Sequence, residues 1–294
     1  MILVVGSSGL LGGMITRQLL AKKRPVRILV RSNPAYQSLI DAGAESMAGD
    51  LKEPASLAQA CAGIQTVITT ANSAERGGED NPETVDWLGT KNLVDAAKAA
   101  GVKHFIYISA LSSDINSPQP ILHAKAQVEQ YVRESGIEFT ILRPNISMDV
   151  LVRVAVGMPL LNGSPVTLVG ESKRKHSFVA AQDMAAFAVA AVTNPAARNQ
   201  SIVIGGPQPV SWLDIVETAR RITGQEIPLQ YFNPGEPLPG LPSEVGMVFG
   251  GLMAYMNTYD SPIEMEAVAK TYGVTLTSVE SFLRGMLNAH ASRT

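Results

Sequence analysis

Three glycines spaced three residues apart directly follow the first apolar run of the chain. The segment reads Gly6-Ser7-Ser8-Gly9-Leu10-Leu11-Gly12. The first glycine permits a tight turn, the second lets the backbone approach phosphates, and the third allows close packing of the next helix. A helical pattern continues to about Lys22, so free N–H groups and a positive dipole end would face an anion. We predict a site for the pyrophosphate of a dinucleotide, the alternative being a purely structural turn.

Arg31 directly follows the second apolar run, Val26–Val30. An acidic residue at this position would bind the ribose 2′-hydroxyl of NAD. A guanidinium instead suits a 2′-phosphate, because its planar fork can donate two hydrogen bonds to it. Arg31 therefore predicts NADP(H) as the cofactor. The alternative is a surface arginine at a strand end.

Two further strand ends carry candidate contacts to the nucleotide. Asp50 and Leu51 follow the third expected strand. Asp50 can accept a hydrogen bond from the adenine amino group, which we slightly favour, or cap the helix that begins near Pro54. Ala71 and Asn72 follow the fourth strand, where the chain should pass close to the ribose and the pyrophosphate.

A regular alternation of strands and helices is needed to place these residues together. Apolar runs at 2–5, 26–30, 44–47, 66–69, 105–108 and 139–142 alternate with helical patterns near 10–22, 54–62, 84–100 and 119–135. This order predicts an α/β protein with a doubly wound, Rossmann-type parallel sheet. The runs are nearly continuous in Val, Ile and Leu, as expected when helices cover both faces of the sheet.

Further motifs extend this pattern over about residues 1–225. With the glycine loop and the strand ends already described, the motifs are Gly6–Gly12, Val30-Arg31, Gly49-Asp50, 89–97 (GTKNLVDAA), 101–109 (GVKHFIYIS), 123–126 (HAKA), Ser135-Gly136, 140–144 (TILRP), 177–179 (SFV) and 183–185 (DMA). In these motifs the chain resembles the NmrA-like branch of the atypical short-chain dehydrogenases, which includes quinone and dye reductases, reductases resembling the isoflavone enzymes, and redox-sensing regulators without turnover.

The resemblance implies a Rossmann domain and a smaller C-terminal substrate-binding lobe. We expect residues 1–145 to form the cofactor-binding domain, with 182–205 returning to its sheet, and residues 146–181 and 206–294 to form the lobe. The resemblance also implies NADP(H) preference and a small-molecule substrate.

The catalytic residues depart from the usual short-chain dehydrogenase pattern. There a tyrosine stands four residues before a lysine on one helix face, and the lysine lowers the tyrosine pKa for proton transfer. Lys125 is present here, but Ile121 occupies the tyrosine position. Ser109 matches the serine that would polarise a carbonyl. Ordinary alcohol–ketone chemistry is therefore in doubt, whereas hydride transfer to a quinone, an enone or an extended cation is not.

Five further residues are candidates near the nicotinamide. We assign Lys125 to ribose anchoring and proton delivery, with an exposed helix lysine as the alternative. His123 is a candidate proton donor, although it lies on another part of the helix circumference. Pro144 and Asn145 are expected beside the nicotinamide. Tyr107 qualifies only if its face of the strand is open to the substrate.

Composition excludes several other classes of protein. The 294 residues are 46% hydrophobic and 17% charged, with a net charge of -2, so nothing indicates nucleic acid or an acidic membrane surface. Four histidines and the single Cys61 show no metal-ligand spacing, and no disulfide can form within the chain. With no signal peptide or membrane span expected, the prediction is a cytoplasmic monomer or homodimer.

Two functions compete. The leading one is an NADPH-dependent reductase of a small conjugated or aromatic substrate. The second, motivated by the missing tyrosine, is a sensor or assembly factor that binds NADP(H) without turnover. A sugar-nucleotide epimerase is a weaker third, because it would need the tyrosine.

Overall fold

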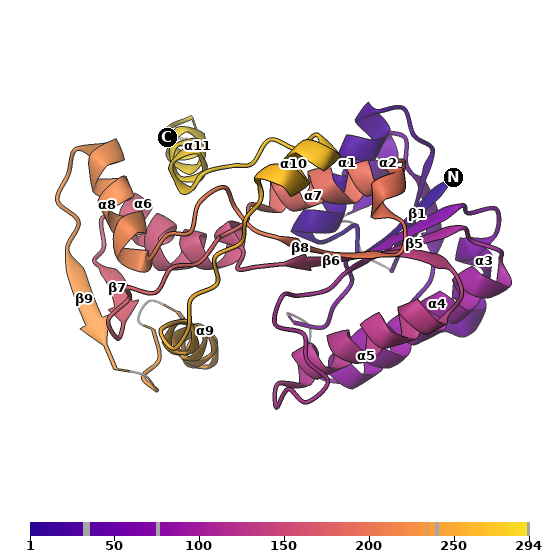
Figure 1. The fold of residues 1–294 in the computed structure, drawn as a ribbon, viewed down its shortest axis with the longest axis horizontal. Helices are drawn as coiled ribbons and strands as arrows, with labels where there is room; N and C mark the ends of the chain where they lie inside the picture. The colour runs from indigo at the N-terminus through magenta and orange to yellow at the C-terminus, as the bar shows by residue number, and fades with distance from the viewer. Residues whose placement is uncertain (32–35, 75–76, 234, 239–240, 293–294) are drawn as a thin grey trace. The chain divides into compact units, whose positions relative to one another are not determined.

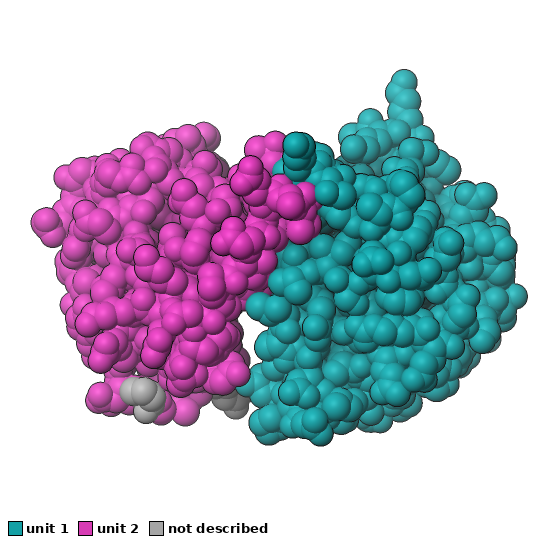
Figure 2. Space-filling view, viewed as in Figure 1, with its two compact units in different colours: residues 1–144, 181–204, 270–274 teal, residues 145–180, 205–269, 275–294 magenta. Residues whose placement is uncertain are grey.

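The computed structural model describes residues 1–31, 36–74, 77–233, 235–238 and 241–292. They form two compact units (Figures 1 and 2). Unit 1 comprises residues 1–144, 181–204 and 270–274, and unit 2 comprises 145–180, 205–269 and 275–294. The prediction places all of 206–294 in the second lobe, but the short segment 270–274 belongs to unit 1.

Unit 1 is built on a seven-stranded sheet in which all strands are parallel. Its order is β3-β2-β1-β4-β5-β6-β8. The order reverses between β1 and β4, which is where ligands bind in open α/β sheets. The predicted doubly wound sheet is confirmed. The strands are β1 (Ile2–Val5), β2 (Val26–Val30), β3 (Glu45–Ala48), β4 (Thr66–Thr69), β5 (His104–Ile108), β6 (Glu138–Pro144) and β8 (Gln200–Ile204).

Helices cover both faces of this sheet (Figure 1). On one face α1 packs against α7, and on the other α3, α4 and α5 lie side by side. The core beneath α3, α4 and α5 includes Leu3, Leu93 and Val128. The helical elements are α1 (Leu10–Ala21), α2 (Gln37–Asp41), α3 (Pro54–Cys61), the π-helical segment η2 (Pro82–Gly89), α4 (Thr90–Ala99), α5 (Pro120–Glu134), α7 (Ala181–Ala191) and the short η4 (Pro195–Ala197).

Unit 2 has its own core and a parallel two-stranded sheet, β7 (Val166–Val169) with β9 (Leu229–Phe232). Trp212 and Phe178 pack edge to face in its centre, 5.2 Å between ring centroids. α10 (Glu266–Tyr272) begins in unit 2 and ends in unit 1. The other helical elements of unit 2 are η3 (Met148–Gly157, π-helical), α6 (Met158–Asn162), α8 (Trp212–Thr223), α9 (Ser243–Met256) and α11 (Val279–Ala291).

α8 shows how local sequence determines an element in unit 2. Ser211 and Asp214 form a reciprocal capping box at its start, which satisfies N–H groups of the first turn. Gly224 adopts the left-handed conformation that ends the helix.

Candidate functional site

The glycine loop between β1 and α1 leaves no room for side chains at two of its positions. Gly6 has φ +91°, and a Cβ there would lie 2.6 Å from Thr70 Oγ1 and 2.8 Å from the Ala71 nitrogen. A Cβ on Gly12 would lie 2.2 Å from the Gly6 carbonyl oxygen. At Gly9 the nearest atom would be 3.4 Å away, so the protein itself constrains Gly9 less.

The N-terminus of α1 is not capped by any side chain. Gly9 is the N-cap residue, and the first turn holds no acidic residue. Ser8, Gly9 and Leu10 are exposed, whereas Ser7 is buried and donates its hydroxyl to the Val4 carbonyl, 3.2 Å away. The unpaired N–H groups of a helix start therefore remain for an anion, and Ser7 can contact it only through its backbone. This geometry fits a pyrophosphate.

A small pocket lies at the carboxyl ends of the first four strands, next to the glycine loop. Gly49 must stay small here, because a Cβ would lie 2.8 Å from both Leu29 Cδ1 and Ser56 Oγ. The pocket thus brings together predicted cofactor residues from four strand ends. Its lining residues are Val5, Gly6, Leu29, Arg31, Tyr36, Gly49, Asp50, Leu51 and Ala71.

Arg31 lies at this pocket in a cluster of charged side chains. Its guanidinium is 3.0 Å from Asp80 Oδ2 and 3.9 Å from Asp50 Oδ2. Lys52 Nζ binds the other Asp80 oxygen at 2.6 Å. The hydrogen bond from Lys52 to Asp80 raises the pKa of that lysine. Two cations therefore stand where Arg31 alone is predicted to meet a 2′-phosphate.

Asp50 and Asn72 make local hydrogen bonds. Asp50 Oδ1 accepts from the Lys52 backbone nitrogen at 2.9 Å, and Glu53, not Asp50, is the uncapped N-cap residue of α3. The helix-capping alternative for Asp50 is therefore not realised. Asn72 donates to the Thr70 carbonyl and accepts from the Ala74 nitrogen, so its side chain shapes the turn after β4.

Lys125 on α5 points to the end of β5. Its ammonium donates to the Ile108 carbonyl at 3.1 Å and lies 5.4 Å from the centre of the Tyr107 ring. Burial lowers the pKa of Lys125, against the opposing effect of the Asp86 and Glu129 carboxylates. A lysine with a lowered pKa releases a proton more readily near neutrality. The exposed-lysine alternative does not describe this environment.

Ser109 is engaged by a buried carboxylate. Its hydroxyl donates to Glu129 Oε1 at 2.5 Å, and only 4% of Ser109 is exposed. Ser113 donates to the same oxygen, and Arg143 and Arg133 pair with Glu129 at 3.0 and 2.8 Å. The hydroxyl proton of Ser109 is thus committed within the protein, which argues against the predicted role of polarising a substrate carbonyl.

His123 and Tyr107 are restricted in what they can do. His123 Nδ1 is 2.6 Å from the Ile115 carbonyl, so Nδ1 donates its proton there and is committed within the protein. Tyr107 is 2% exposed, and burial raises its pKa well above the usual value. The condition for a catalytic Tyr107, an open strand face, is not met.

Pro144 and Asn145 stand at the boundary between the two units. Pro144 ends β6 opposite Ile204 of β8, and its carbonyl accepts from the Leu111 nitrogen. Asn145 belongs to unit 2, where its side chain donates to the carbonyl and the hydroxyl of Ser261, both at 3.0 Å. Contact of either residue with a nicotinamide remains a prediction.

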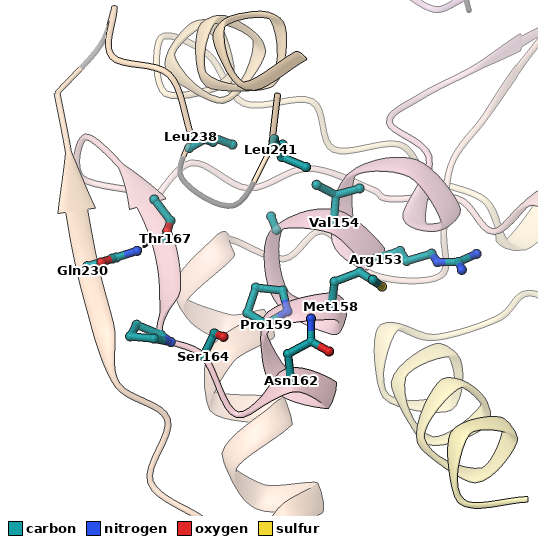
Figure 3. A pocket seen from close by; sticks show the side chains of 12 residues that line it. Arg153, Val154, Met158, Pro159, Asn162, Ser164, Thr167, Gln230, Leu238 and Leu241 are labelled. Atoms are coloured by element: carbon teal, nitrogen blue, oxygen red, sulfur yellow. Dashed lines mark hydrogen bonds between the residues drawn. The ribbon is translucent and has the colours of Figure 1, made fainter. Parts of the chain in front are cut away.

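Unit 2 contains a cavity of about 500 Å³ between its strand pair and the η3–α6 segment (Figure 3). Gln230 on β9 donates to Thr167 on β7 at 2.7 Å, so part of its polar lining is already paired. The Arg153 side chain extends away from the strands in Figure 3. Most of the remaining lining is apolar: Val154, Ala155, Met158, Pro159, Pro165, Leu238 and Leu241, with Asn162 and Ser164.

Four charged residues of the site were not predicted from the sequence: Lys52, Asp80, Asp86 and Glu129. Asp86 is buried and accepts two hydrogen bonds from Ser73, at 3.0 and 2.6 Å. Glu129 had a usable signal, because it stands four residues after Lys125 on one helix face. Asp80 had none, because it follows β4 in the chain and approaches Arg31 only through the fold.

In the part of the chain that the structure describes, no three His, Cys, Asp or Glu side chains gather as metal ligands. No helix among the described residues has the length and apolar character to cross a membrane.

The parallel sheet and its glycine loop define a Rossmann-type protein. The model of the NmrA-like family matches residues 1–283, and the chain belongs to this family. The predicted resemblance is confirmed.

Individual relatives agree with this assignment. The chain is 32% identical over 227 residues to an NAD(P)H azoreductase of Xenophilus azovorans, covering 77% of this chain and 75% of that protein. It is 30% identical over 225 residues to the photosystem II assembly factor Ycf39 of Trieres chinensis, covering 76% and 69%. In fold it is similar to an NADPH-dependent quinone oxidoreductase of Escherichia coli, with TM-score 0.82, 21% identity and coverage of 98% and 100%.

Proposed function

We propose that this protein is an NADPH-dependent reductase of a small conjugated or aromatic substrate, such as a quinone, an enone or a dye. NADP(H) is the cofactor, and its reduced form would supply the hydride for the reduction. The observation that carries the proposal is the open N-terminus of α1 behind the glycine loop, together with Arg31 at the end of β2. The 32% identity to an NAD(P)H azoreductase supports it.

Different residues of the chain would bind the parts of the cofactor and supply the proton. The backbone of 6–12 would hold the pyrophosphate, Arg31 the 2′-phosphate, and the pocket with Leu51 and Ala71 the adenosine. Lys125 would anchor the nicotinamide ribose and supply a proton, since its ammonium lies at the end of β5, where it donates to the Ile108 carbonyl. Ile121 in place of a tyrosine favours acceptors that need a hydride more than a strong acid.

The apolar cavity of unit 2 supports the substrate class. A volume of about 500 Å³ is typical of sites for small molecules. Its aliphatic lining with few polar groups suits a flat, apolar molecule better than a sugar nucleotide.

Turnover of a substrate panel tests the proposal. Purified protein with NADPH should reduce at least one of a set of quinones, enones and azo dyes, followed by loss of NADPH absorbance. Lys125→Ala should abolish that reduction, whereas Lys103→Gln at the opposite edge of the sheet should leave it unchanged. Absence of NADPH oxidation above the blank over the whole panel would refute a reductase.

The cofactor assignment has a separate test. Arg31→Asp should weaken binding of NADPH far more than that of NADH, because a charge-assisted contact to the 2′-phosphate is worth roughly 1.5–3 kcal/mol. Titration followed by nucleotide fluorescence measures both. Equal affinity of the wild type for the two nucleotides would contradict the assignment.

A second candidate is an NADP(H)-binding assembly factor or redox sensor without turnover. The specific observation in its favour is that Ser109 and Lys125 are both hydrogen-bonded within the protein and no tyrosine stands at 121. The similarity to the assembly factor Ycf39 supports it too. Tight binding that distinguishes NADP⁺ from NADPH, without consumption of either on any acceptor, would favour this function over the first.

A further inference from the structure

Asp80 holds a cation on each of its two carboxylate oxygens. Arg31 binds Oδ2 at 3.0 Å and Lys52 binds Oδ1 at 2.6 Å. The Asp80 side chain is only 14% exposed, whereas those of Arg31 and Lys52 are 40% and 36% exposed. The carboxylate therefore sits between two cations that still reach solvent beside the nucleotide pocket.

A carboxylate in this position offers the same contacts as a phosphate monoester. Both present oxygens that accept charge-assisted hydrogen bonds from arginine and lysine. Arg31 lines the pocket formed by Gly6, Asp50 and Ala71, so an adenosine ribose bound there would bring its 2′ substituent toward the same cations. Asp80 and a 2′-phosphate would then compete for one pair of donors.

The charges around the pocket make this competition consequential. Arg31 and Lys52 carry two positive charges, Asp50 and Asp80 carry two negative ones, and the Glu79 carboxylate also acts on Lys52, so the cluster has no excess of positive charge. A phosphate dianion entering it meets repulsion from Asp80 as well as attraction from the cations. A free 2′-hydroxyl, by contrast, can donate a hydrogen bond to the same carboxylate.

We propose that Lys52 is the second cation of the 2′-phosphate subsite and that Asp80 is an internal competitor for it, so that the two residues together set the ratio of NADPH to NADH affinity. The proposal rests on the proposed function in one respect, the binding of NADP(H). It goes further in naming residues that raise and lower the preference for the 2′-phosphate.

Several bonds that hold the segment around Asp80 do not use its side chain. The helical segment after it is capped by Asn81, whose side chain accepts from the Glu83 and Thr84 nitrogens at 3.0 Å. Thr84 Oγ1 also donates to the Glu79 carbonyl at 2.6 Å. These bonds can remain in Asp80→Asn, which removes the negative charge and keeps the size of the side chain.

Two adenosine nucleotides that differ by one group measure the effect without catalysis. Calorimetric titration with adenosine 2′,5′-bisphosphate and with AMP should show that Lys52→Gln weakens the bisphosphate about fivefold and leaves AMP within about twofold. Asp80→Asn should strengthen the bisphosphate by a similar factor. Lys52→Arg should keep the wild-type ratio of the two affinities. Lys103→Gln removes the same charge at the amino-terminal end of β5, away from the carboxyl ends that form the pocket, and should change the affinity for neither ligand.

Each other outcome overturns part of the proposal. An equal loss of both ligands in Lys52→Gln would show a general effect of charge and no contact to the 2′-phosphate. Weaker bisphosphate binding in Asp80→Asn would show that Asp80 orders the site and does not compete for it. If the wild type binds neither the bisphosphate nor NADPH, the proposed cofactor itself is wrong, an outcome that the variants cannot mimic.

Discussion

Ser109 donates its hydroxyl proton to Glu129 over 2.5 Å, and this bond joins the end of β5 to the middle of α5. Glu129 also accepts a hydrogen bond from the Ser113 hydroxyl and forms ion pairs with Arg133 and Arg143. A buried carboxylate with this many donors fixes the strand end against the helix that carries Lys125. In this family member the serine at the end of β5 therefore helps to hold α5 in place.

Replacing Glu129 by Gln should destabilise the protein at neutral pH by about 2 kcal/mol, because two ion pairs lose their carboxylate. Burial raises the pKa of Glu129, but the hydrogen bonds from Ser109, Ser113 and Arg133 and the charge of Arg143 outweigh it and leave the pKa lowered. This stabilisation is present above the ordinary value of 4.5 and is lost as pH falls below it.

Urea unfolding of wild type and Glu129→Gln at pH 7 and pH 4 measures this. The difference in free energy of unfolding should shrink at the lower pH. A pH-independent difference would mean that Glu129 contributes through packing alone.

Lys125 should act as a proton donor only while it is charged, so the rate of reduction should fall as pH rises through its pKa. Burial places that pKa below the ordinary 10.5. The pH profile of kcat should therefore show a descending limb below that value. Lys125→Met should flatten the limb and lower the rate at least tenfold. A descending limb that persists in Lys125→Met would assign the proton to another group.

Gly12→Ala should damage the nucleotide site, and Gly13→Ala offers the matched control. The new Cβ at position 12 would lie 2.2 Å from the Gly6 carbonyl, so α1 would have to move away from the loop. We expect a loss of about 2 kcal/mol in stability and at least tenfold weaker NADPH binding. At position 13 the nearest atoms would be the flexible Arg17 guanidinium at 3.2 Å and the Ser7 carbonyl oxygen at 3.3 Å, so a small shift suffices, and helix propensity gains up to about 1 kcal/mol. Equal effects of the two variants would contradict the close-approach argument.

The sheet could be predicted from the sequence because each of its inner strands is a short, largely apolar run. The runs at 2–5, 26–30 and 66–69 coincide with β1, β2 and β4. The helical pattern at 84–100 is one continuous stretch in the sequence, but its first part is π-helical. Unit 2 was harder, because β7 and β9 are four residues each and pair in parallel across some 60 residues of chain, so no short local pattern links them.

The parts of the candidate site that directly follow a strand could be predicted. The parts that a later loop brings back to the same strand ends could not. Arg31 and the glycine loop follow from their place after β2 and β1. Asp80 meets Arg31 from a position 49 residues further along the chain, and no local spacing records that contact. The prediction therefore names Arg31 but neither Asp80, which pairs with it, nor Lys52, which binds the other Asp80 oxygen.

His104 should make the protein lose stability between pH 6.5 and pH 5, before Glu129 begins to titrate. Burial, with a smaller effect of the Arg198 charge, lowers the pKa of His104 to about 3. The Thr140 hydroxyl donates to the Ala197 carbonyl at 2.7 Å, so it accepts from His104 Nε2 at 2.8 Å. The proton of the neutral ring is therefore on Nε2. Nδ1 is unprotonated and has no hydrogen-bond partner among the described residues. The folded state thus keeps the ring neutral at pH 5, while the unfolded chain takes up a proton below 6.5. Because the unfolded state binds more protons in this window, stability falls as pH falls, by about 2 kcal/mol at pH 5.

His104→Gln can still donate to Thr140 but does not titrate, so urea unfolding at pH 7.5 and pH 5 should show a smaller loss for the variant than for the wild type. His176 is common to both proteins and cancels in the comparison. Identical pH dependence of the two would place a charged His104 in the folded state and contradict the buried, neutral ring.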